Sequence, residues 1–279
     1  MGVCWDLKGL VYSVRDPAGS GIAKYIIEYY RLDKSDECKN SITCYRGSDF
    51  YIVGFSEDVI YFEFLDSRLP VSVTEYIVLS RHSSAQYVKS YTVHHTGNFG
   101  EALYGGKPGK LGVANPITAH KLLLGLRRYC EEDQRCSEYE VSYEATHHGP
   151  TENNKPLCFV EIGSSIDEWR DPINHRIVAL AVIDYLENPV HECNIVTGIG
   201  GGHYPRKHTR LALEKEYCYG HIMAKYALQY LSEHVLDQMI ERSKPKPRKL
   251  VVEKKGTRKE HRELIEEYVK KRGLELEYV

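Results

Sequence analysis

The chain has 279 residues, of which 42% are hydrophobic and 27% are charged, and its formal net charge is −2 at pH 7. These values are ordinary for a folded globular protein and exclude a mainly disordered, collagen-like or strongly basic chain. No apolar run approaches the ~20 residues that a membrane-spanning helix needs. Asp6 and Lys8 interrupt the N-terminal segment, which argues against a signal peptide, so we expect a cytoplasmic protein.

The first part of the chain alternates short apolar runs with turn residues. Leu10–Val14 is predicted to be a strand, and a helix is predicted over Ile22–Tyr30. Between them, a Gly19–Gly21 turn would leave backbone N–H groups free at a helix start, a weak signal for an anion site. Further short strands are expected at Ser41–Arg46, Phe50–Phe55, Val59–Phe62, Tyr76–Leu79 and Ser90–Val93.

Two helices of the second part have a polar cap followed by proline. Asn115-Pro116 and Asp171-Pro172 each place a capping side chain before a proline at the first helical position, and the second helix should end near Glu187. A glycine-rich loop with two lysines, Gly105–Gly112, precedes the first of them. Strands are predicted at Tyr139–Ala145, Leu157–Ile162 and Asn194–Thr197, and the tail is predicted as strand, helix and strand over Leu250–Val252, Thr257–Arg272 and Leu274–Tyr278.

The alternation of strands and helices predicts an α/β fold with a mixed, largely parallel sheet flanked by helices. We expect a catalytic domain over residues 1–243 and a strand-helix-strand extension over residues 244–279, which either forms an appendage or belongs to the same domain. Residues 241–272 contain 13 Lys/Arg and 6 Asp/Glu, a local charge of +7. Such a segment either contacts a polyanion or is a solvated helix with paired charges.

The eight cysteines form no C-x-x-C pair, which argues against a zinc ribbon or a thioredoxin motif. Two interpretations stay open. The cysteines are buried reduced thiols, as is usual in the cytosol. Alternatively, Cys38 with Cys44 and Cys130 with Cys136 form local disulfides, which is credible for a protein from a hyperthermophile.

Histidines cluster beside glycines at the ends of strand-like runs. The clusters contain His82, the pair His94-His95, the pair His147-His148, and His203. In α/β folds, functional side chains gather past the carboxyl ends of strands, so we expect these clusters to converge there. Adjacent strand residues point to opposite faces, so one histidine of each pair should face the site while its neighbour packs or supports it.

Several histidines with a carboxylate fit a divalent metal such as Zn²⁺, which makes a bound water nucleophilic at neutral pH. The predicted metal ligands are His94, His147, His203 and Glu144. The predicted catalytic residues are His148, Glu161, His95 and Thr151. Glu144 lies four residues before His148, so the two side chains would share a face of an undistorted strand.

A metal-free mechanism is the alternative. His148 or His95 would activate a water or the hydroxyl of Thr151 or Thr96, and glycine-loop N–H groups would bind the oxyanion. The sequence contains neither the H-E-x-x-H zinc motif nor the G-x-S-x-G nucleophile motif, so a serine nucleophile is disfavoured.

Four strings occur in a recognisable order: V-H-H-T-G-N-F-G, A-T-H-H-G-P-T, E-I-G-S-S and G-I-G-G-G-H-Y-P-R-K. In these blocks and in its length the chain resembles the D-aminoacyl-tRNA deacylases of the archaeal and plant type. The resemblance implies hydrolysis of the ester between a D-amino acid and tRNA. It also implies one or two zinc ions per subunit, a monomer, and an α/β fold similar to peptidyl-tRNA hydrolases and phosphorylases.

A tRNA substrate needs cationic contacts to the phosphates of its acceptor end. The predicted contacts are Arg81, Lys107, Lys110, Arg206 and Lys207, and the terminal adenine would stack on a tyrosine such as Tyr204. Two other functions remain open on the residues alone. One is a zinc-dependent peptidase or amidohydrolase that acts on small molecules, and the other is a tRNA-binding protein without catalysis.

Overall fold

The computed structural model describes residues 7–83 and 87–279. Its strands are β1 (Leu7–Ser13), β2 (Asp33–Lys34), β3 (Thr43–Arg46), β4 (Phe50–Phe55), β5 (Val73–Ser83), β6 (Ser90–His95), β7 (Glu140–Tyr143), β8 (Leu157–Ser164), β9 (Asn194–Ile199), β10 (Tyr217–Met223), β11 (Lys249–Val252) and β12 (Glu275–Tyr278). Its helices are α1 (Pro17–Tyr30), α2 (Leu65–Arg68), α3 (Pro116–Glu132), α4 (Ile166–Arg170), α5 (Pro172–Glu187), α6 (Arg206–Lys215), α7 (Glu233–Glu241) and α8 (Lys259–Arg272).

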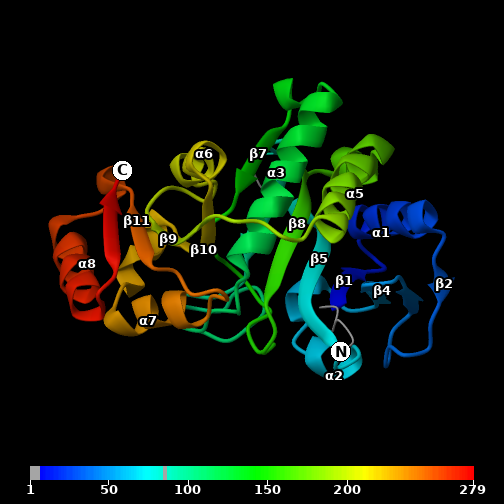
Figure 1. Ribbon diagram of the computed structural model, residues 1–279, viewed down its shortest axis with the longest axis horizontal. Helices are drawn as coiled ribbons and strands as arrows, with labels where there is room; N and C mark the ends of the chain where they lie inside the picture. The colour runs from blue at the N-terminus through cyan, green and yellow to red at the C-terminus, as the bar shows by residue number, and fades with distance from the viewer. Residues whose placement is uncertain (1–6, 84–86) are drawn as a thin grey trace.

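The strands form two sheets, which lie next to each other in Figure 1. The larger sheet has the order β2-β3-β4-β1-β5-β8-β6-β7. Its centre, β4-β1-β5-β8, is parallel, whereas β6 runs antiparallel to β8 and parallel to β7. The smaller sheet, β10-β9-β11-β12, is parallel throughout. The predicted α/β class with a mixed, largely parallel sheet is confirmed.

Helices α1, α3 and α5 pack on one face of the larger sheet and form its main hydrophobic core. All three begin at the same local signal, a polar cap followed by proline. The side chains of Asp16, Asn115 and Asp171 accept hydrogen bonds from the first backbone N–H groups of α1, α3 and α5. The two helix starts predicted from Asn115-Pro116 and Asp171-Pro172 are confirmed, because the caps satisfy donors that the helix leaves unpaired.

The predicted strand-helix-strand tail is confirmed as β11, α8 and β12, with α8 beginning two residues after the predicted start. The tail completes the smaller sheet, since β11 pairs with β9 and β12 pairs with β11. Helices α7 and α8 cover this sheet through residues such as Met239 and Ile265. Several cations of the tail form ion pairs, including Lys271 with Glu233, so much of its positive charge is compensated.

Two local predictions were wrong. Val59–Tyr61 is a 3₁₀ turn instead of a strand, because the Asp58 carboxylate accepts a hydrogen bond from the Ile60 N–H and starts a helical turn. Gly19–Gly21 lies inside α1, and the Asp16 carboxylate accepts hydrogen bonds from the Ala18 and Gly19 N–H groups, at 2.9 and 3.3 Å. These donors are therefore used within the protein, and the anion site expected at this turn does not form.

Six of the cysteines are paired as disulfides, including the two predicted pairs Cys38–Cys44 and Cys130–Cys136. The pair Cys193–Cys218 was not predicted. Cys158 is buried and free, and Cys4 lies outside the described residues. Within residues 7–83 and 87–279, none of the helices combines the length and the apolar character needed to cross a bilayer.

Candidate functional site

Three strands of the larger sheet carry functional side chains on one face. Glu161 of β8 lies opposite Thr92 of β6, and His94 lies opposite Phe159. His82 of β5 lies opposite Gly163. Side chains alternate along a strand, so His82, His94 and Glu161 project from the same face. This is the face opposite α1, α3 and α5, and part of it is covered by the segment that contains Val59, Phe62 and Leu65.

Two loops complete the cluster from the side of the smaller sheet. The segment after β7 is held by hydrogen bonds from Glu144 N to Val93 O at 3.0 Å and from Thr146 N to Ile222 O at 2.9 Å. The glycine loop after β9 is attached to it, because Ala145 N donates to His203 O at 2.8 Å. The junction of the two sheets therefore brings Glu144, His147 and His148 next to His203.

Glu144 is the centre of the cluster. Its carboxylate oxygens lie 2.8 Å from Nε2 of His203, 3.1 Å from Nδ1 of His82 and 3.6 Å from Nε2 of His147. The second carboxylate, Glu161, lies 3.4 Å from Nδ1 of His82 and 3.7 Å from Nε2 of His94. Both glutamates are almost completely buried, so each carboxylate depends on these imidazoles for its stabilisation.

The backbone fixes the orientation of three imidazoles. Nδ1 of His94 lies 3.2 Å from the His95 carbonyl, Nδ1 of His147 lies 2.8 Å from the Ala145 carbonyl, and Nδ1 of His148 lies 2.6 Å from the Gly149 carbonyl. A carbonyl only accepts, so each Nδ1 carries the proton. Burial lowers the pKa of His147 and His148, so their Nε2 atoms keep a free lone pair. Burial opposes protonation of His94, but the Glu161 carboxylate outweighs it and raises the pKa of His94. Metal-binding histidines commonly have this arrangement, in which the outer nitrogen is tied to a carbonyl.

The pKa shifts divide the cluster into a charged part and a neutral part. Burial opposes protonation of His82, but the Glu144 and Glu161 carboxylates outweigh it and raise the pKa of His82 to about 10. Burial alone would raise the pKa of both glutamates, but the imidazoles hold the pKa of each below its usual range. Burial and neighbouring imidazoles lower the pKa of His147 and His148, that of His148 to about 4. Neutral imidazoles and ionised carboxylates are the forms that bind metals.

The cluster fits a zinc ion. Among the described residues, His94 Nε2 and both Glu144 oxygens are buried without a partner in hydrogen-bond geometry, although imidazole nitrogens lie nearby. In a tetrahedral zinc site with N and O ligands, neighbouring ligand atoms lie roughly 3.3 Å apart, close to the contacts found here. Three groups have ligand atoms within 4.8 Å of one another: His94-His147-His148, His82-Glu144-His203 and His94-Glu144-Glu161.

A cavity of about 510 Å³ opens beside the cluster. Its wall includes His148, Glu161 and His203 together with Arg81 and Tyr104. This volume lies within the range of small-molecule binding sites. A substrate group inside it would therefore contact the imidazoles and carboxylates directly.

The predicted metal ligands His94, His147, His203 and Glu144 meet in this cluster, and so do His148 and Glu161. His95 does not, because β6 turns it to the opposite face, where Nδ1 lies 3.2 Å from the Leu157 carbonyl. The structure therefore gives no support to the catalytic role predicted for His95.

Three further expectations need correction. Thr151 Oγ1 accepts a hydrogen bond from Lys107 N at 2.9 Å and does not line the cavity, so it does not occupy a nucleophile's position. His147, not His148, lies near Glu144, because the chain leaves the strand after Tyr143 and His148 has a positive φ of 43°. The expected gathering past carboxyl ends holds for His147, His148 and His203, which follow β7 and β9. It does not hold for Glu161, which lies within β8 on a sheet face.

The sequence-based site list omits His82, although it bridges both glutamates. Its signal was its place after an apolar run, in the string S-R-H. Tyr204 supports this histidine, since its hydroxyl lies 2.8 Å from Nε2 of His82. The position of His82 at the end of a strand does not indicate which face of the sheet its side chain occupies. That face becomes known only from the pairing of β5 with β8.

The predicted tRNA-contacting cations lie in different settings. Arg81 borders the cavity and pairs with Asp58 at 3.4 Å. Lys107 and Lys110 both pair with Glu152, at 2.6 Å each. Arg206 binds both oxygens of the Glu140 carboxylate, and the Lys207 side chain is half-buried. The side chains of Lys107 and Arg206 are exposed, whereas those of Arg81, Lys110 and Lys207 are partly buried.

Two buried histidines outside the cluster should make the free energy of unfolding depend on pH in the acid range. His208 and His221 are fully buried, and burial lowers the pKa of His208 to about 4 and of His221 to about 3. In the unfolded chain each pKa returns to ~6.5. The unfolded state therefore binds more protons between these values, and the free energy of unfolding should fall as pH drops from 6.5 towards 4.

Each of these groups contributes up to about 1.4 kcal/mol per pH unit within that window. Urea unfolding at pH 7, 6 and 5 measures the slope. His208→Asn should flatten it, whereas His234→Ala, which removes an exposed histidine, should leave it unchanged. A free energy of unfolding that is constant from pH 7 to 5 would contradict this prediction.

Comparisons with known proteins show the family and the overall fold. The sequence model of the D-aminoacyl-tRNA deacylase family matches residues 69–277. A D-aminoacyl-tRNA deacylase of Staphylothermus marinus is 68% identical, with 98% of this chain and 100% of the relative covered. One of Desulfurococcus amylolyticus is 60% identical, with 97% and 99% covered. The crystal structure of a conserved protein of unknown function superimposes with a TM-score of 0.90 at 30% identity, covering 98% of this chain and 95% of that one. On the strength of the family match and of these relatives, this chain belongs to the D-aminoacyl-tRNA deacylase family.

Proposed function

We propose that this protein hydrolyses the ester of D-aminoacyl-tRNA to a free D-amino acid and tRNA, with a zinc-activated water as nucleophile. The observation that carries the metal part is the buried cluster of carboxylates and imidazoles, whose possible ligand atoms form three groups with separations within 4.8 Å. The substrate follows from the family to which the chain belongs.

The ligands of the proposed zinc come from the three groups of the cluster, two of which contain Glu144 and two of which contain His94, so they could hold one ion or two that share ligands. When bound, zinc lowers the pKa of a coordinated water to about 7 and polarises the ester carbonyl. The protein itself contributes orientation. Backbone carbonyls fix the rings of His94 and His147, and the Tyr204 hydroxyl fixes His82.

His148 is the proposed proton acceptor. Its Nδ1–H donates to the Gly149 carbonyl at 2.6 Å, which leaves Nε2 as the basic atom. Its lowered pKa keeps it unprotonated at neutral pH, so Nε2 can take a proton from the attacking water. Attack on the ester carbonyl then gives a tetrahedral oxyanion, and its collapse breaks the bond to the ribose oxygen of tRNA, which takes the proton from His148.

In this proposal the acceptor end of tRNA enters the cavity beside Arg81, while Lys107, Lys110, Arg206 and Lys207 contact phosphates. Arg81 supports this assignment most directly, because it borders both the cavity and the surface and lies over the ring of Trp169 at 5.5 Å. We further propose that the protein acts as a monomer, as the resemblance to the archaeal and plant deacylases implies.

The test of the proposed function is the release of D-tyrosine from D-tyrosyl-tRNA by the purified protein, with L-tyrosyl-tRNA as the control substrate. We expect hydrolysis of the D form, loss of activity on chelation, and recovery with added Zn²⁺. Activity on small D-amino-acid esters with little dependence on salt would instead indicate a peptidase or amidohydrolase. Salt-sensitive tRNA binding without product would indicate a binding protein without catalysis.

His148→Ala should lower kcat/KM at least ~10²-fold, because it removes the proposed proton acceptor. Zinc content measured on the same variant separates its two possible roles, since loss of zinc indicates a ligand and full zinc content indicates a base. His234→Ala removes an exposed imidazole and should retain full activity. Activity of His148→Ala near that of the unmodified protein would remove this residue from the chemistry.

A further inference from the structure

A second group of candidate ligands lies outside the active site and shares no residue with it. His120, His191, Cys193 and Cys218 have ligand atoms that all lie within 4.8 Å of one another. They come from α3, from the connection between α5 and β9, and from β10. Segments far apart in the sequence therefore bring two imidazoles and two sulfurs to one point.

The orientation of His120 is fixed as in a metal site. The residue is fully buried, and its Nε2 lies 3.0 Å from the Ala212 carbonyl. Nε2 therefore carries the proton, and the lone pair of Nδ1 accepts a hydrogen bond from His191 Nε2–H at 2.8 Å.

The two cysteines are close enough for either of two states. In the structure they form a disulfide with a Cα–Cα distance of 5.9 Å. Such a bond uses the sulfurs alone and gives the adjacent imidazole pair no role. Reduced, the same sulfurs complete a set of two thiolates and two imidazoles, which is the Cys₂His₂ composition of closed structural zinc sites.

We propose that His120, His191, Cys193 and Cys218 bind one structural Zn²⁺ ion in the reduced protein. On binding, both thiols release their protons to solvent, and the two thiolates neutralise the charge of the ion, so the buried site carries no net charge. Four protein ligands leave no open position, so the site has no part in catalysis.

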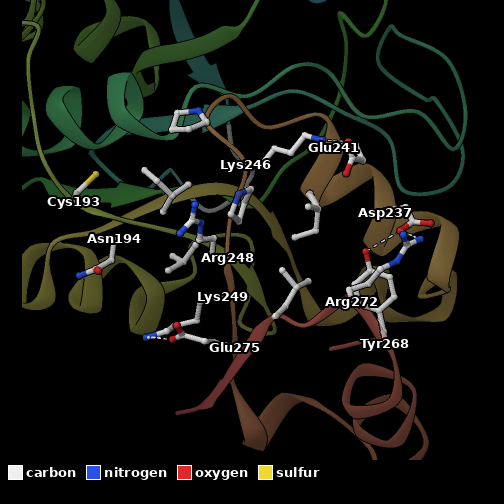
Figure 2. A pocket seen from close by; sticks show the side chains of 16 residues that line it. Cys193, Asn194, Asp237, Glu241, Lys246, Arg248, Lys249, Tyr268, Arg272 and Glu275 are labelled. Carbon is white, nitrogen blue, oxygen red and sulfur yellow. Dashed lines mark hydrogen bonds and ion pairs between the residues drawn. The ribbon is translucent and has the colours of Figure 1, made fainter. Parts of the chain in front are cut away.

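The proposed ion would connect the two sheets. His120 belongs to α3, which packs on the larger sheet, whereas Cys193 immediately precedes β9 and Cys218 lies in β10 of the smaller sheet. The ion can reach the site from solvent, because Cys193 lines the edge of a cavity of about 800 Å³ near β9 and β11 (Figure 2). Removal of the ion should therefore loosen the contact between the sheets and lower Tm.

Cobalt provides the test, since Co²⁺ replaces Zn²⁺ and a thiolate–Co²⁺ pair absorbs in the near ultraviolet. Reduced, metal-free full-length protein is titrated with Co²⁺ under anaerobic conditions after its thiols have been counted. We expect a thiolate–cobalt band and intense tetrahedral visible bands. Among the described residues, the active-site cluster contains no cysteine, so its own cobalt adds no thiolate band.

His191→Ala is the decisive variant, because it keeps both cysteines and changes a half-buried loop residue. It should weaken cobalt binding at least ~10-fold and change the visible spectrum, and Cys218→Ser should abolish or strongly weaken the band. Cys136→Ser, which alters a cysteine of another pair, should keep the full spectrum. Absence of the band in protein with all thiols reduced, or a spectrum unchanged by His191→Ala, would overturn the proposal in favour of a disulfide alone.

Discussion

Replacing Glu144 by glutamine should lower kcat/KM at least ~10³-fold and reduce the zinc content. Glu144 is fully buried as a side chain, and three imidazoles from different segments lie within 3.6 Å of its carboxylate. Glutamine keeps the shape of the side chain. It removes the negative charge that balances the positive charges of the proposed ion and of protonated His82. Loss of metal forfeits several kcal/mol of charge stabilisation, at about 1.4 kcal/mol per tenfold in rate.

Kinetics on D-tyrosyl-tRNA and metal analysis of the same preparation measure this effect. Glu140→Gln is the matched control, because Glu140 lies in β7, four residues earlier, and pairs with the exposed Arg206. It should retain zinc and nearly full activity. If Glu144→Gln kept both its zinc and its activity, Glu144 would be neither a ligand nor a charge that the chemistry needs.

The second large effect concerns stability and a different buried carboxylate. Glu75 is 3% exposed and accepts from Lys8 Nζ at 2.8 Å, from Asn115 Nδ2 at 2.6 Å and from Thr118 Oγ1 at 2.8 Å, and the Tyr185 hydroxyl also donates to it. Glu75→Ala leaves four donors, including an ammonium group, without their acceptor. Removing one partner of such a buried pair costs about 3–5 kcal/mol.

Urea unfolding at neutral pH measures this loss as a lower free energy of unfolding. Glu28→Ala is the control, since Glu28 forms an exposed ion pair with Lys24 at 3.8 Å, and exposed pairs contribute about 0–1 kcal/mol. A Glu75→Ala protein within 1 kcal/mol of the Glu28→Ala protein would mean that the network of Glu75 contributes little to the fold.

Local chemistry explains the parts of the fold that could be predicted. The helices after Asn115 and Asp171 begin where predicted, because a capping side chain and the following proline act within one turn. The predicted strands at Phe50–Phe55 and Leu157–Ile162 correspond to β4 and β8. Local chemistry also explains why the strand predicted at Val59–Phe62 was wrong. Its apolar residues favoured a strand, whereas the Asp58 side chain caps a helical turn.

The candidate site could be predicted only in part, because its composition is local and its geometry is not. The histidines beside glycines led to the prediction that Glu144, His147 and His203 lie close together in the folded protein. The alternation along β6 correctly implied that His94 and His95 face opposite ways, but not which of them faces the site. That choice depends on which sheet face the helices cover.

The sequence by itself determined the helix caps, the short apolar strands and the supply of imidazoles and carboxylates, since each depends on residues within a few positions. Tertiary structure decided that His82 joins Glu144 and Glu161, that His95 and Thr151 stay apart, and that Cys218 meets His120. These meetings depend on strand register and on the junction of two sheets. Both are fixed by the burial of apolar surface between distant segments, which no short stretch of sequence encodes.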